Sequence, residues 1–288
     1  MAVFSLFSVT GCKEPVLTGK AFVYYIEADP LNLDPQLAED NQSLLVIRNI
    51  FEGLLRKEAD GSLGLGVAKS YTVNETGTHY EFSLREDAVW HFPGEGESAP
   101  VTAEDFVYAF RRIFDSTTRS PYAEDFFCIQ NGQEVLNGTL PAEELGIYAE
   151  TPYLLVMDLE YADPLFLERL TSAPAMPCNE DFFLSTKGKY GLNVKATPAN
   201  GPFYLRNWTA DTSLFLKSNP NYISDSPVLA DSVTLQVQSD TSRWIDGFID
   251  QKADAILCSG PAVEQILHKG YQTESFDDTV WGLVFQLE

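Results

Sequence analysis

Residues 232–257 read SVTLQVQSDTSRWIDGFIDQKADAIL, and this stretch decides the fold class. It opens with SVTLQVQ, an alternating run of apolar and polar side chains that is typical of a half-buried strand. The alternation of element types continues to the end of the chain: strand 232–238, helix 243–251, strand 253–257, helix 261–269 and a closing strand 280–285. Strands that alternate with helices favour a mixed or parallel sheet with helices packed on it. We therefore predict a mixed α/β fold.

Upstream patterns predict further elements of both kinds. Apolar side chains recur at helical spacing from Leu44 to Leu55, and Ser43 is the expected N-cap of that helix. A second helix is expected over 101–115, with Thr102 as N-cap and Asp105 in a capping-box position. The remaining expected elements are strands 22–26, 79–85 and 153–160, helix 164–170, and a hairpin of strands 201–208 and 213–219.

Composition and charge exclude several functional classes. The chain has 288 residues, of which 44% are hydrophobic, which is ample for a packed core. Its formal net charge is −23, and a charge of this sign repels nucleic acid and anionic lipid surfaces. We therefore expect no nucleic-acid partner.

The first residues differ from the rest of the chain. MAVFSLFSVTGC is apolar and small up to Cys12, and the sequence turns polar directly afterwards, which is typical of the end of an export signal. VTGC (9–12) resembles the lipobox of bacterial lipoproteins, so Cys12 is the expected lipidated residue and residues 1–20 the expected tether. The alternative is a frayed terminal segment. No other segment approaches the ~20 apolar residues of a transmembrane helix.

The sequence contains no recognisable catalytic or metal-binding motif. His79, His91 and His268 lie far apart, and none has a second ligand at metal-binding spacing. Beyond Cys12, the cysteines are widely spaced and lie among apolar neighbours, as small buried hydrophobic residues do: Cys128, Cys178 and Cys258. Nucleophile elbows and phosphate loops are missing as well. We predict no catalytic residue, no metal, no cofactor and no enzymatic activity.

Five ordered blocks of this sequence resemble a known family. They are residues 31–71, 80–92, 101–123, 137–160 and 199–222, beginning with LNLDPQLAEDNQSLLVIRNIFEGLL and ending with ANGPFYLRNWTADTSLFLKSNPNY. Together they resemble the extracellular solute-binding proteins of family 5, and within it the oligopeptide-binding branch that serves ABC importers. The resemblance extends from about residue 22 to the end of the chain.

This resemblance implies a two-lobed, periplasmic-binding-protein-like type II architecture with the ligand in a cleft between the lobes. Residues 21–51 and 178–280 are expected to form the first, ligand-binding lobe, and 52–177 an inserted α+β subdomain. Residues 281–288 are expected to be the crossover into a second lobe that this sequence does not contain. We expect a chain with one lobe to bind peptide only weakly, because the closed cleft needs both.

The resemblance also implies ligand-binding residues. Family members present a cleft-lining loop after LDP, where this sequence has Glu39, Asp40 and Asn41. Tyr122 in SPYA matches a cleft tyrosine that stacks on ligand and hydrogen-bonds to it. Trp281 and Gln286 lie on the strand nearest the hinge. The alternatives are a solvated loop acid for Glu39, packing against the helix for Tyr122 and a core position for Trp281.

The function that the resemblance implies is capture of extracellular oligopeptides for delivery to a membrane permease of an ABC importer. Such a protein is exported and either lipid-anchored on the outer face of the cytoplasmic membrane, through Cys12 alone, or periplasmic. On the same scaffold, dipeptides, nickel chelates and oligosaccharides are alternative ligands. A secreted hydrolase or a signalling receptor is the alternative of another class, because fold does not determine function.

Overall fold

The computed structural model describes residues 20–58, 60–94, 98–223 and 228–274. Strands β1 (Lys20–Ile26), β12 (Ala230–Val237), β11 (Ser213–Ser218) and β10 (Phe203–Thr209) form sheet A in that spatial order. β1 is parallel to β12, whereas β11 is antiparallel to both of its neighbours. This pairing confirms the mixed sheet and the α/β class.

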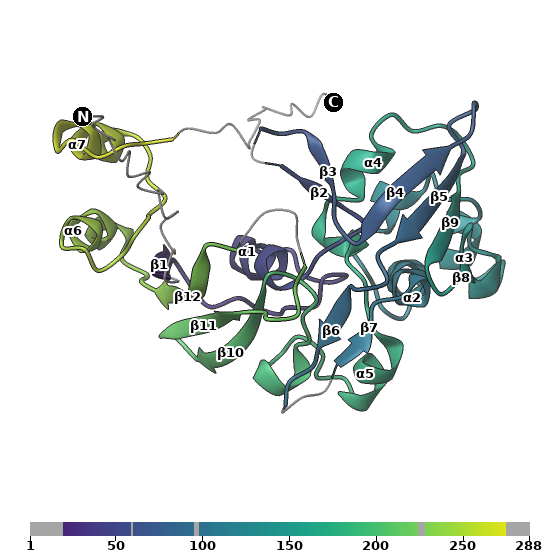
Figure 1. The fold of residues 1–288 in the computed structure, drawn as a ribbon, viewed down its shortest axis with the longest axis horizontal. Helices are drawn as coiled ribbons and strands as arrows, with labels where there is room; N and C mark the ends of the chain where they lie inside the picture. The colour runs from purple at the N-terminus through teal and green to yellow at the C-terminus, as the bar shows by residue number, and fades with distance from the viewer. Residues whose placement is uncertain (1–19, 59, 95–97, 224–227, 275–288) are drawn as a thin grey trace, which may run out of the picture.

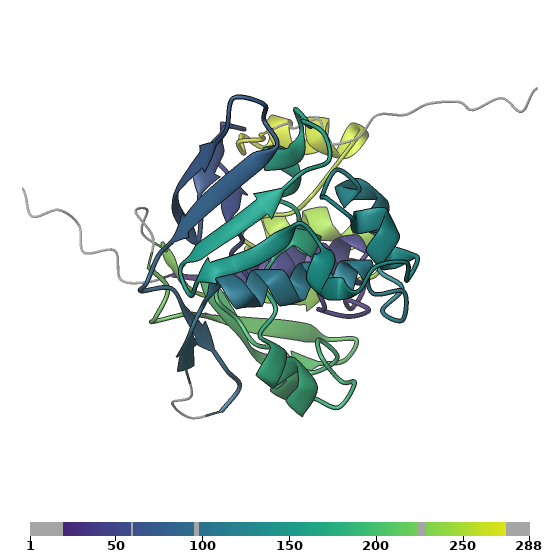
Figure 2. The same cartoon turned by 90° about the vertical axis from the view of Figure 1, so that its right-hand side faces the viewer.

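A second sheet lies on the other side of the molecule. Sheet C consists of β4 (Ala68–Val73), β5 (His79–Leu84), β9 (Leu154–Asp158) and β8 (Ile147–Thr151), and all of its pairings are antiparallel. Sheet C faces the viewer in Figure 2, far from α6 and α7 in Figure 1. Two short hairpins complete the strands: β2 (Leu55–Lys57) with β3 (Leu63–Leu65), and β6 (Val89–His91) with β7 (Ser98–Pro100).

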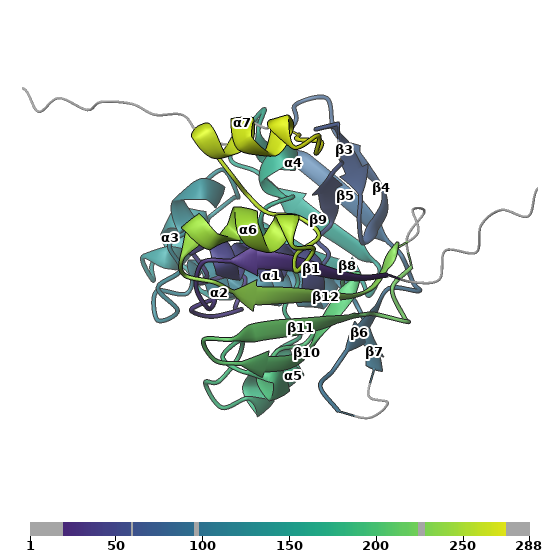
Figure 3. The same cartoon turned by 90° about the vertical axis from the view of Figure 1, so that its left-hand side faces the viewer.

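The helices cover and connect these sheets. They are α1 (Asn41–Ile50), α2 (Ala103–Phe114), α3 (Gly132–Leu136), α4 (Phe166–Arg169), α5 (Glu180–Ser185), α6 (Trp244–Ile249) and α7 (Pro261–His268). α6 lies beside β1, where Tyr25 and Trp244 contact each other at a centroid distance of 6.3 Å (Figure 3). The predicted helices 243–251 and 261–269 are thus confirmed within two residues at each end, and 164–170 shortens to α4.

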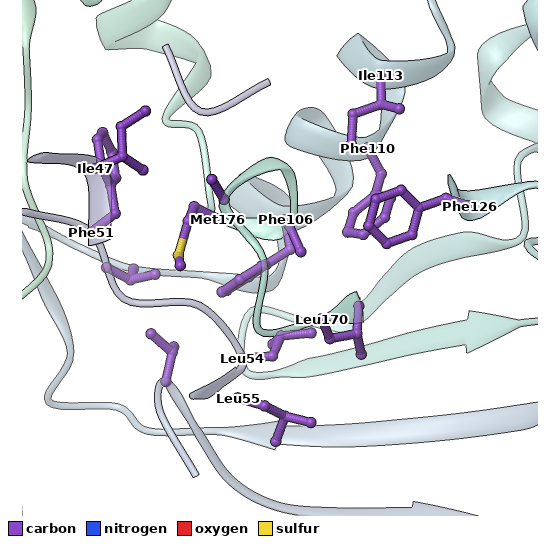
Figure 4. Packing of buried hydrophobic residues seen from close by; sticks show 14 of the residues in the cluster. Ile47, Phe51, Leu54, Leu55, Phe106, Phe110, Ile113, Phe126, Leu170 and Met176 are labelled. Carbon is purple, nitrogen blue, oxygen red and sulfur yellow. The ribbon is translucent and has the colours of Figure 1, made fainter. Parts of the chain in front are cut away.

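One continuous cluster of buried side chains joins the two sheets. It includes Leu205 and Leu214 of sheet A together with Phe82 and Leu155 of sheet C. The helix α2 supplies the predicted apolar stripe, and its side chains Phe106, Phe110, Ile113 and Phe114 are fully buried. Figure 4 shows the first three of them. Its N-terminus has the predicted capping box, in which the Thr102 N–H donates to Asp105 Oδ2 at 2.7 Å. Burial of this stripe fixes α2 against sheet C.

The limits predicted for the first helix were wrong. Asp40, not Ser43, is the N-cap, because its Oδ1 accepts the Ser43 N–H at 2.8 Å while Ser43 lies inside the helix. The helix ends at Ile50 rather than continuing to Leu55. There the Ile50 carbonyl accepts the N–H groups of Asn200 and Gly201, at 3.1 and 2.9 Å. A tertiary contact therefore ends α1, and no local pattern records it.

The predicted strand 253–257 is reduced to a single bridge. Ala255 pairs in parallel with Tyr24 on the free edge of β1, and the Asp254 N–H donates to the Val23 carbonyl at 2.8 Å. The Val23 N–H, however, donates to the side-chain Oδ2 of Asp254 at 2.8 Å. Because a carboxylate takes the place of a main-chain acceptor, the ladder does not continue. The predicted closing strand 280–285 lies outside the described residues.

A partly exposed histidine on sheet C, paired with two carboxylates, makes the stability of the fold depend on pH. His79 Nδ1 lies 2.6 Å from Asp158 Oδ1, and Nε2 lies 3.4 Å from Glu81 Oε1. The hydrogen bond with Asp158 raises the pKa of His79 above its usual value. The pair therefore stabilises the fold fully below the unfolded pKa of about 6.5, and this contribution is lost as pH rises through the folded pKa.

We expect His79→Gln to lower the free energy of unfolding more at pH 5 than at pH 8, by less than about 1 kcal/mol because water screens the pair. Urea denaturation at the two pH values measures this difference. His268→Gln, an exposed position on α7, is the control and should shift neither curve. A His79→Gln effect of equal size at both pH values would contradict the assignment.

Candidate functional site

A buried ion pair anchors the loop that precedes α1. The guanidinium of Arg112 on α2 donates to both carboxylate oxygens of Asp34, with NH1 3.0 Å from Oδ1 and NH2 2.5 Å from Oδ2. Both side chains are only 6% exposed. Phe183 lies 4.1 Å below the guanidinium and completes its apolar surroundings. A bidentate pair of this kind fixes position and orientation together.

Gln36 extends this anchor to the rest of the loop. Its Oε1 accepts from Arg112 NH1 at 2.5 Å, and its Nε2 donates to the carbonyls of Pro174 and Met176 at 3.1 and 3.0 Å. Its own carbonyl accepts from the Ser120 hydroxyl at 2.7 Å. Residues far apart in sequence therefore anchor this loop, which directly precedes the residues predicted to contact ligand.

Four of the predicted site residues come together at the N-terminus of α1. Glu39 and Asn41 are exposed, and Asp40 between them is half-buried. The Tyr122 hydroxyl donates to the carbonyl of Ala38, one residue before Glu39. Burial raises the pKa of Tyr122, and the negative charge of Glu39 raises it further. The phenol thus stays neutral and keeps oxygen lone pairs beside two exposed polar side chains.

Asp40 is already engaged within the protein. Its Oδ1 accepts the Ser43 N–H at 2.8 Å, and its Oδ2 accepts from the Ser43 hydroxyl at 2.5 Å and from the Leu31 N–H at 3.4 Å. These contacts position Glu39 and Asn41 on either side of it. Ligand contact by Asp40 stays a prediction. Trp281, Gln286 and Cys12, which complete the predicted set, lie outside the described residues.

A cavity that no sequence pattern predicted opens beside the C-terminal end of α1. It has a volume of about 680 Å³ and lies between α1, β2 and α4. Its walls are Arg48, Phe51, Glu52, Gly53, Leu55, Arg56, Lys57, Leu165, Glu168, Arg169, Thr171, Ser172, Met176, Pro202 and Tyr222. Figure 1 shows where α1, β2 and α4 lie in the fold. Charged and apolar side chains mix in it, as they do in ligand pockets.

Glu52 is the buried charged group of this cavity. The residue is 8% exposed, and its Oε2 accepts from the Tyr222 hydroxyl. Asn200 fixes the backbone, since its Oδ1 accepts the Glu52 N–H at 3.0 Å and its Nδ2 donates to the Glu52 carbonyl at 2.8 Å. Burial raises the pKa of Glu52 more than the Tyr222 hydrogen bond and the charge of Arg56 lower it.

Among the described residues, no group of three or more His, Cys, Asp or Glu side chains is placed to hold a metal ion. Cys128 and Cys178 are buried as predicted, whereas Cys258 is only half-buried, and all three are free thiols. Within the same described part of the chain, no helix is both long and apolar enough to cross a bilayer.

The chain is similar to a known protein family and to several known proteins. The model of the bacterial extracellular solute-binding proteins, family 5 Middle, matches residues 63–287. The dipeptide-binding protein of Lactococcus lactis subsp. cremoris is 27% identical over 272 residues, which cover 93% of this chain and 48% of that protein. The periplasmic oligopeptide-binding protein OppA of Salmonella typhimurium is 32% identical over 229 residues, covering 76% of this chain and 40% of OppA.

A solved structure agrees with these sequence matches. The substrate-binding domain of an oligopeptide ABC transporter from Bacillus anthracis superposes with a TM-score of 0.81 at 30% identity. The superposition covers 87% of this chain and 47% of that domain. The chain therefore spans about half the length of the relatives that it matches.

Proposed function

The chain belongs to family 5 of the bacterial extracellular solute-binding proteins, and on that premise we propose that it captures oligopeptides for import by an ABC transporter. The observation that carries the proposal is the set of relatives, whose names specify dipeptides and oligopeptides as ligands. The exposed polar group at the N-terminus of α1 supports it, because its residues are those that the family resemblance implies. The chain acts by binding, and we propose no catalytic step.

The proposed capture uses the main chain of an extended peptide. Glu39 accepts hydrogen bonds from peptide N–H groups or from a basic group, and the Asn41 amide both donates and accepts. The Tyr122 ring offers a stacking surface, and its oxygen can accept from ligand while its O–H donates to the Ala38 carbonyl. Contacts of this kind ignore side-chain identity, so the proposed ligand class is broad.

The anchored loop gives this site its rigidity. Asp34, Gln36 and the Asp40 cap together hold the stretch before α1 through side chains that are buried or half-buried. Binding to a preorganised loop loses less conformational entropy than binding to a mobile one. We propose that Glu39 and Asn41 keep the same positions with and without peptide.

The remaining features of the proposal come from the family. We propose a ligand-binding lobe of residues 21–51 and 178–280, an inserted subdomain of 52–177, and a crossover at 281–288 that brings Trp281 and Gln286 to the hinge. We further propose export, a lipid anchor at Cys12, and delivery of the peptide to a membrane permease. Relatives named as periplasmic support the exported location.

We expect Glu39→Gln to weaken peptide binding about tenfold or more, because a hydrogen bond to a charged group contributes about 1.5–3 kcal/mol. Heteronuclear NMR titration of the 288-residue chain with trialanine measures this at the millimolar concentrations that weak binding requires. The control is Glu134→Gln, which removes an exposed carboxylate on α3. Equal affinity of the two variants would rule out a ligand role for Glu39.

A further inference from the structure

Strand β4 is an open edge of sheet C. It stands at one end of the strand order β4-β5-β9-β8, and among the described strands it pairs only with β5. Every residue of β4 after Ala68 is exposed. Because successive side chains point to opposite faces of a sheet, this exposure means that β4 is open on both faces. An edge strand left open in this way is a template for another strand.

The hydrogen-bond pattern shows which main-chain groups face the open edge. The Asn74 N–H donates to the His79 carbonyl at 3.0 Å, where the ladder of β4 with β5 ends. Hydrogen-bonded and non-hydrogen-bonded pairs alternate along an antiparallel ladder, so the main-chain groups of Thr72 also face β5. The N–H and carbonyl groups of Tyr71 and Val73 therefore point away from β5. These are the groups that a further strand would meet.

The edge strand also carries apolar side chains that the rest of the sheet does not cover. Tyr71 and Val73 are 37% and 46% exposed, although they share a face with their buried partners Phe82 and Tyr80 on β5. The apolar face of sheet C thus extends onto β4. A further strand beside β4 would cover these two side chains.

We propose that β4 pairs antiparallel with β4 of a second copy of this chain, about a two-fold axis at Thr72. In this register Tyr71 of each copy lies opposite Val73 of the other. The outward main-chain groups of these two residues then form the hydrogen-bonded pairs. The two Thr72 side chains meet on the other face, where a Thr–Thr pair is favourable. The two copies of sheet C become one continuous sheet.

The residues at the two ends of β4 favour a second copy as the partner. Lys69 and Glu75 are both exposed, and the register centred on Thr72 brings Lys69 of each copy opposite Glu75 of the other. A shift of two residues keeps the same main-chain groups paired, but it sets Lys69 against Val73 in one direction and Tyr71 against Glu75 in the other. Only the register centred on Thr72 matches charge with charge and apolar with apolar. The sequence of β4 is therefore complementary to itself.

The proposed pairing is short, and the dimer is therefore weak. Residues 70–73 form the regular part of β4, because its ladder with β5 is irregular between Ala68 and Ser70. The net charge of −23 on each copy adds repulsion at low salt. Salt screens this repulsion, since the Debye length is about 8 Å at physiological ionic strength. We expect dimers at high protein concentration and physiological salt, and monomers in dilute solution.

Exchange of the two end charges tests the register. In the proposed dimer, Lys69→Glu sets two glutamates opposite each other, and Glu75→Lys sets two lysines opposite each other. Each variant alone should raise the dimer dissociation constant at least about tenfold, because like charges directly opposite are destabilising. An equimolar mixture of the two variants should restore dimers, since both cross-strand pairs are then complementary. Sedimentation velocity over a concentration series at physiological salt measures the association.

The controls change the charge by the same amount elsewhere. Lys217→Glu on β11 and Glu264→Lys on α7 alter exposed residues and should leave the dissociation constant nearly unchanged. A mixture of Lys69→Glu with Glu75→Lys that associates no better than either variant alone would overturn the pairing. Monomers of the unsubstituted chain throughout the concentration series would overturn it as well.

Hydrogen exchange of the unsubstituted 288-residue chain, followed by NMR, tests the main-chain contacts without any variant. The amides of Tyr71 and Val73 should exchange quickly in dilute solution and slowly at high protein concentration. The Thr72 amide faces β5 and should be protected in both. Protection that grows with concentration on β1 or β10 instead would assign the dimer to another sheet edge and overturn the proposal.

Discussion

Replacing Asp34 with alanine is expected to lower the free energy of unfolding by about 3–5 kcal/mol, because it leaves the buried Arg112 guanidinium without its counter-charge. Burial alone disfavours the charged form of Arg112, but the hydrogen bond and the charge of Asp34 more than offset this and raise its pKa. A guanidinium stays protonated in proteins, so Arg112 remains charged in the variant, where Gln36 is its one strong hydrogen-bond acceptor among the described residues. Equilibrium urea denaturation, followed by circular dichroism, measures the loss.

An exposed ion pair provides the matched control for this prediction. Asp250 and Lys252 pair at 3.1 Å, with side chains 58% and 68% exposed. Asp250→Ala should cost less than about 1 kcal/mol. If the Asp34→Ala variant does not fold, the double substitution Asp34→Leu with Arg112→Leu should restore a cooperative unfolding transition. Replacing a buried ion pair with apolar residues is often neutral or stabilising. A loss for Asp34→Ala no larger than that for Asp250→Ala would contradict the anchoring role of this pair.

The second large loss of stability is expected from a substitution in the aromatic core that α2 contributes to. Phe110 is fully buried, and its ring meets Phe126 edge to face at a centroid distance of 5.1 Å and an angle of 87° (Figure 4). Phe110→Ala removes both the buried area and this contact and leaves a cavity. We expect a loss of about 3–5 kcal/mol in the free energy of unfolding.

Thermal and urea unfolding of Phe110→Ala should be compared with Leu184→Ala. Leu184 lies on α5 with 59% of its surface exposed, so its truncation should change the unfolding free energy by less than about 0.5 kcal/mol. Since Phe110 belongs to the cluster that joins both sheets, its loss should shift the unfolding of the whole chain. Separate transitions, with only one of them moved, would contradict a single cooperative core.

Local patterns in the sequence predicted the elements whose cause is local. The apolar stripe of α2 and its capping box are set by residues within one helix, and both are present in the structure. Strand β12 forms where the alternation of apolar and polar residues predicted a strand. The predicted N-cap of α1 was wrong because Asp40 and Ser43 are both good capping residues. The backbone conformation before the helix decides between them.

The features that hold the site depend on contacts between distant residues, which one sequence does not record. Asp34 and Arg112 are 78 positions apart, and neither residue type indicates burial. The Asp254 carboxylate accepts the Val23 N–H at the edge of the sheet, where a strand ladder would need a main-chain acceptor. Glu52 looks like an ordinary polar residue after a helix, and only the fold reveals its burial. The family resemblance predicted Glu39 and Tyr122 because it carries such distant information implicitly.

The most direct test of peptide capture is paramagnetic relaxation from a spin-labelled peptide. A trialanine that carries a nitroxide at its C-terminus is added to the 288-residue chain, and broadening of amide signals is mapped. The account predicts broadening centred on Glu39, Asn41 and Tyr122, reversed by excess unlabelled trialanine. Broadening spread evenly over the surface, or centred on sheet C, would contradict the claim that the N-terminus of α1 receives peptide.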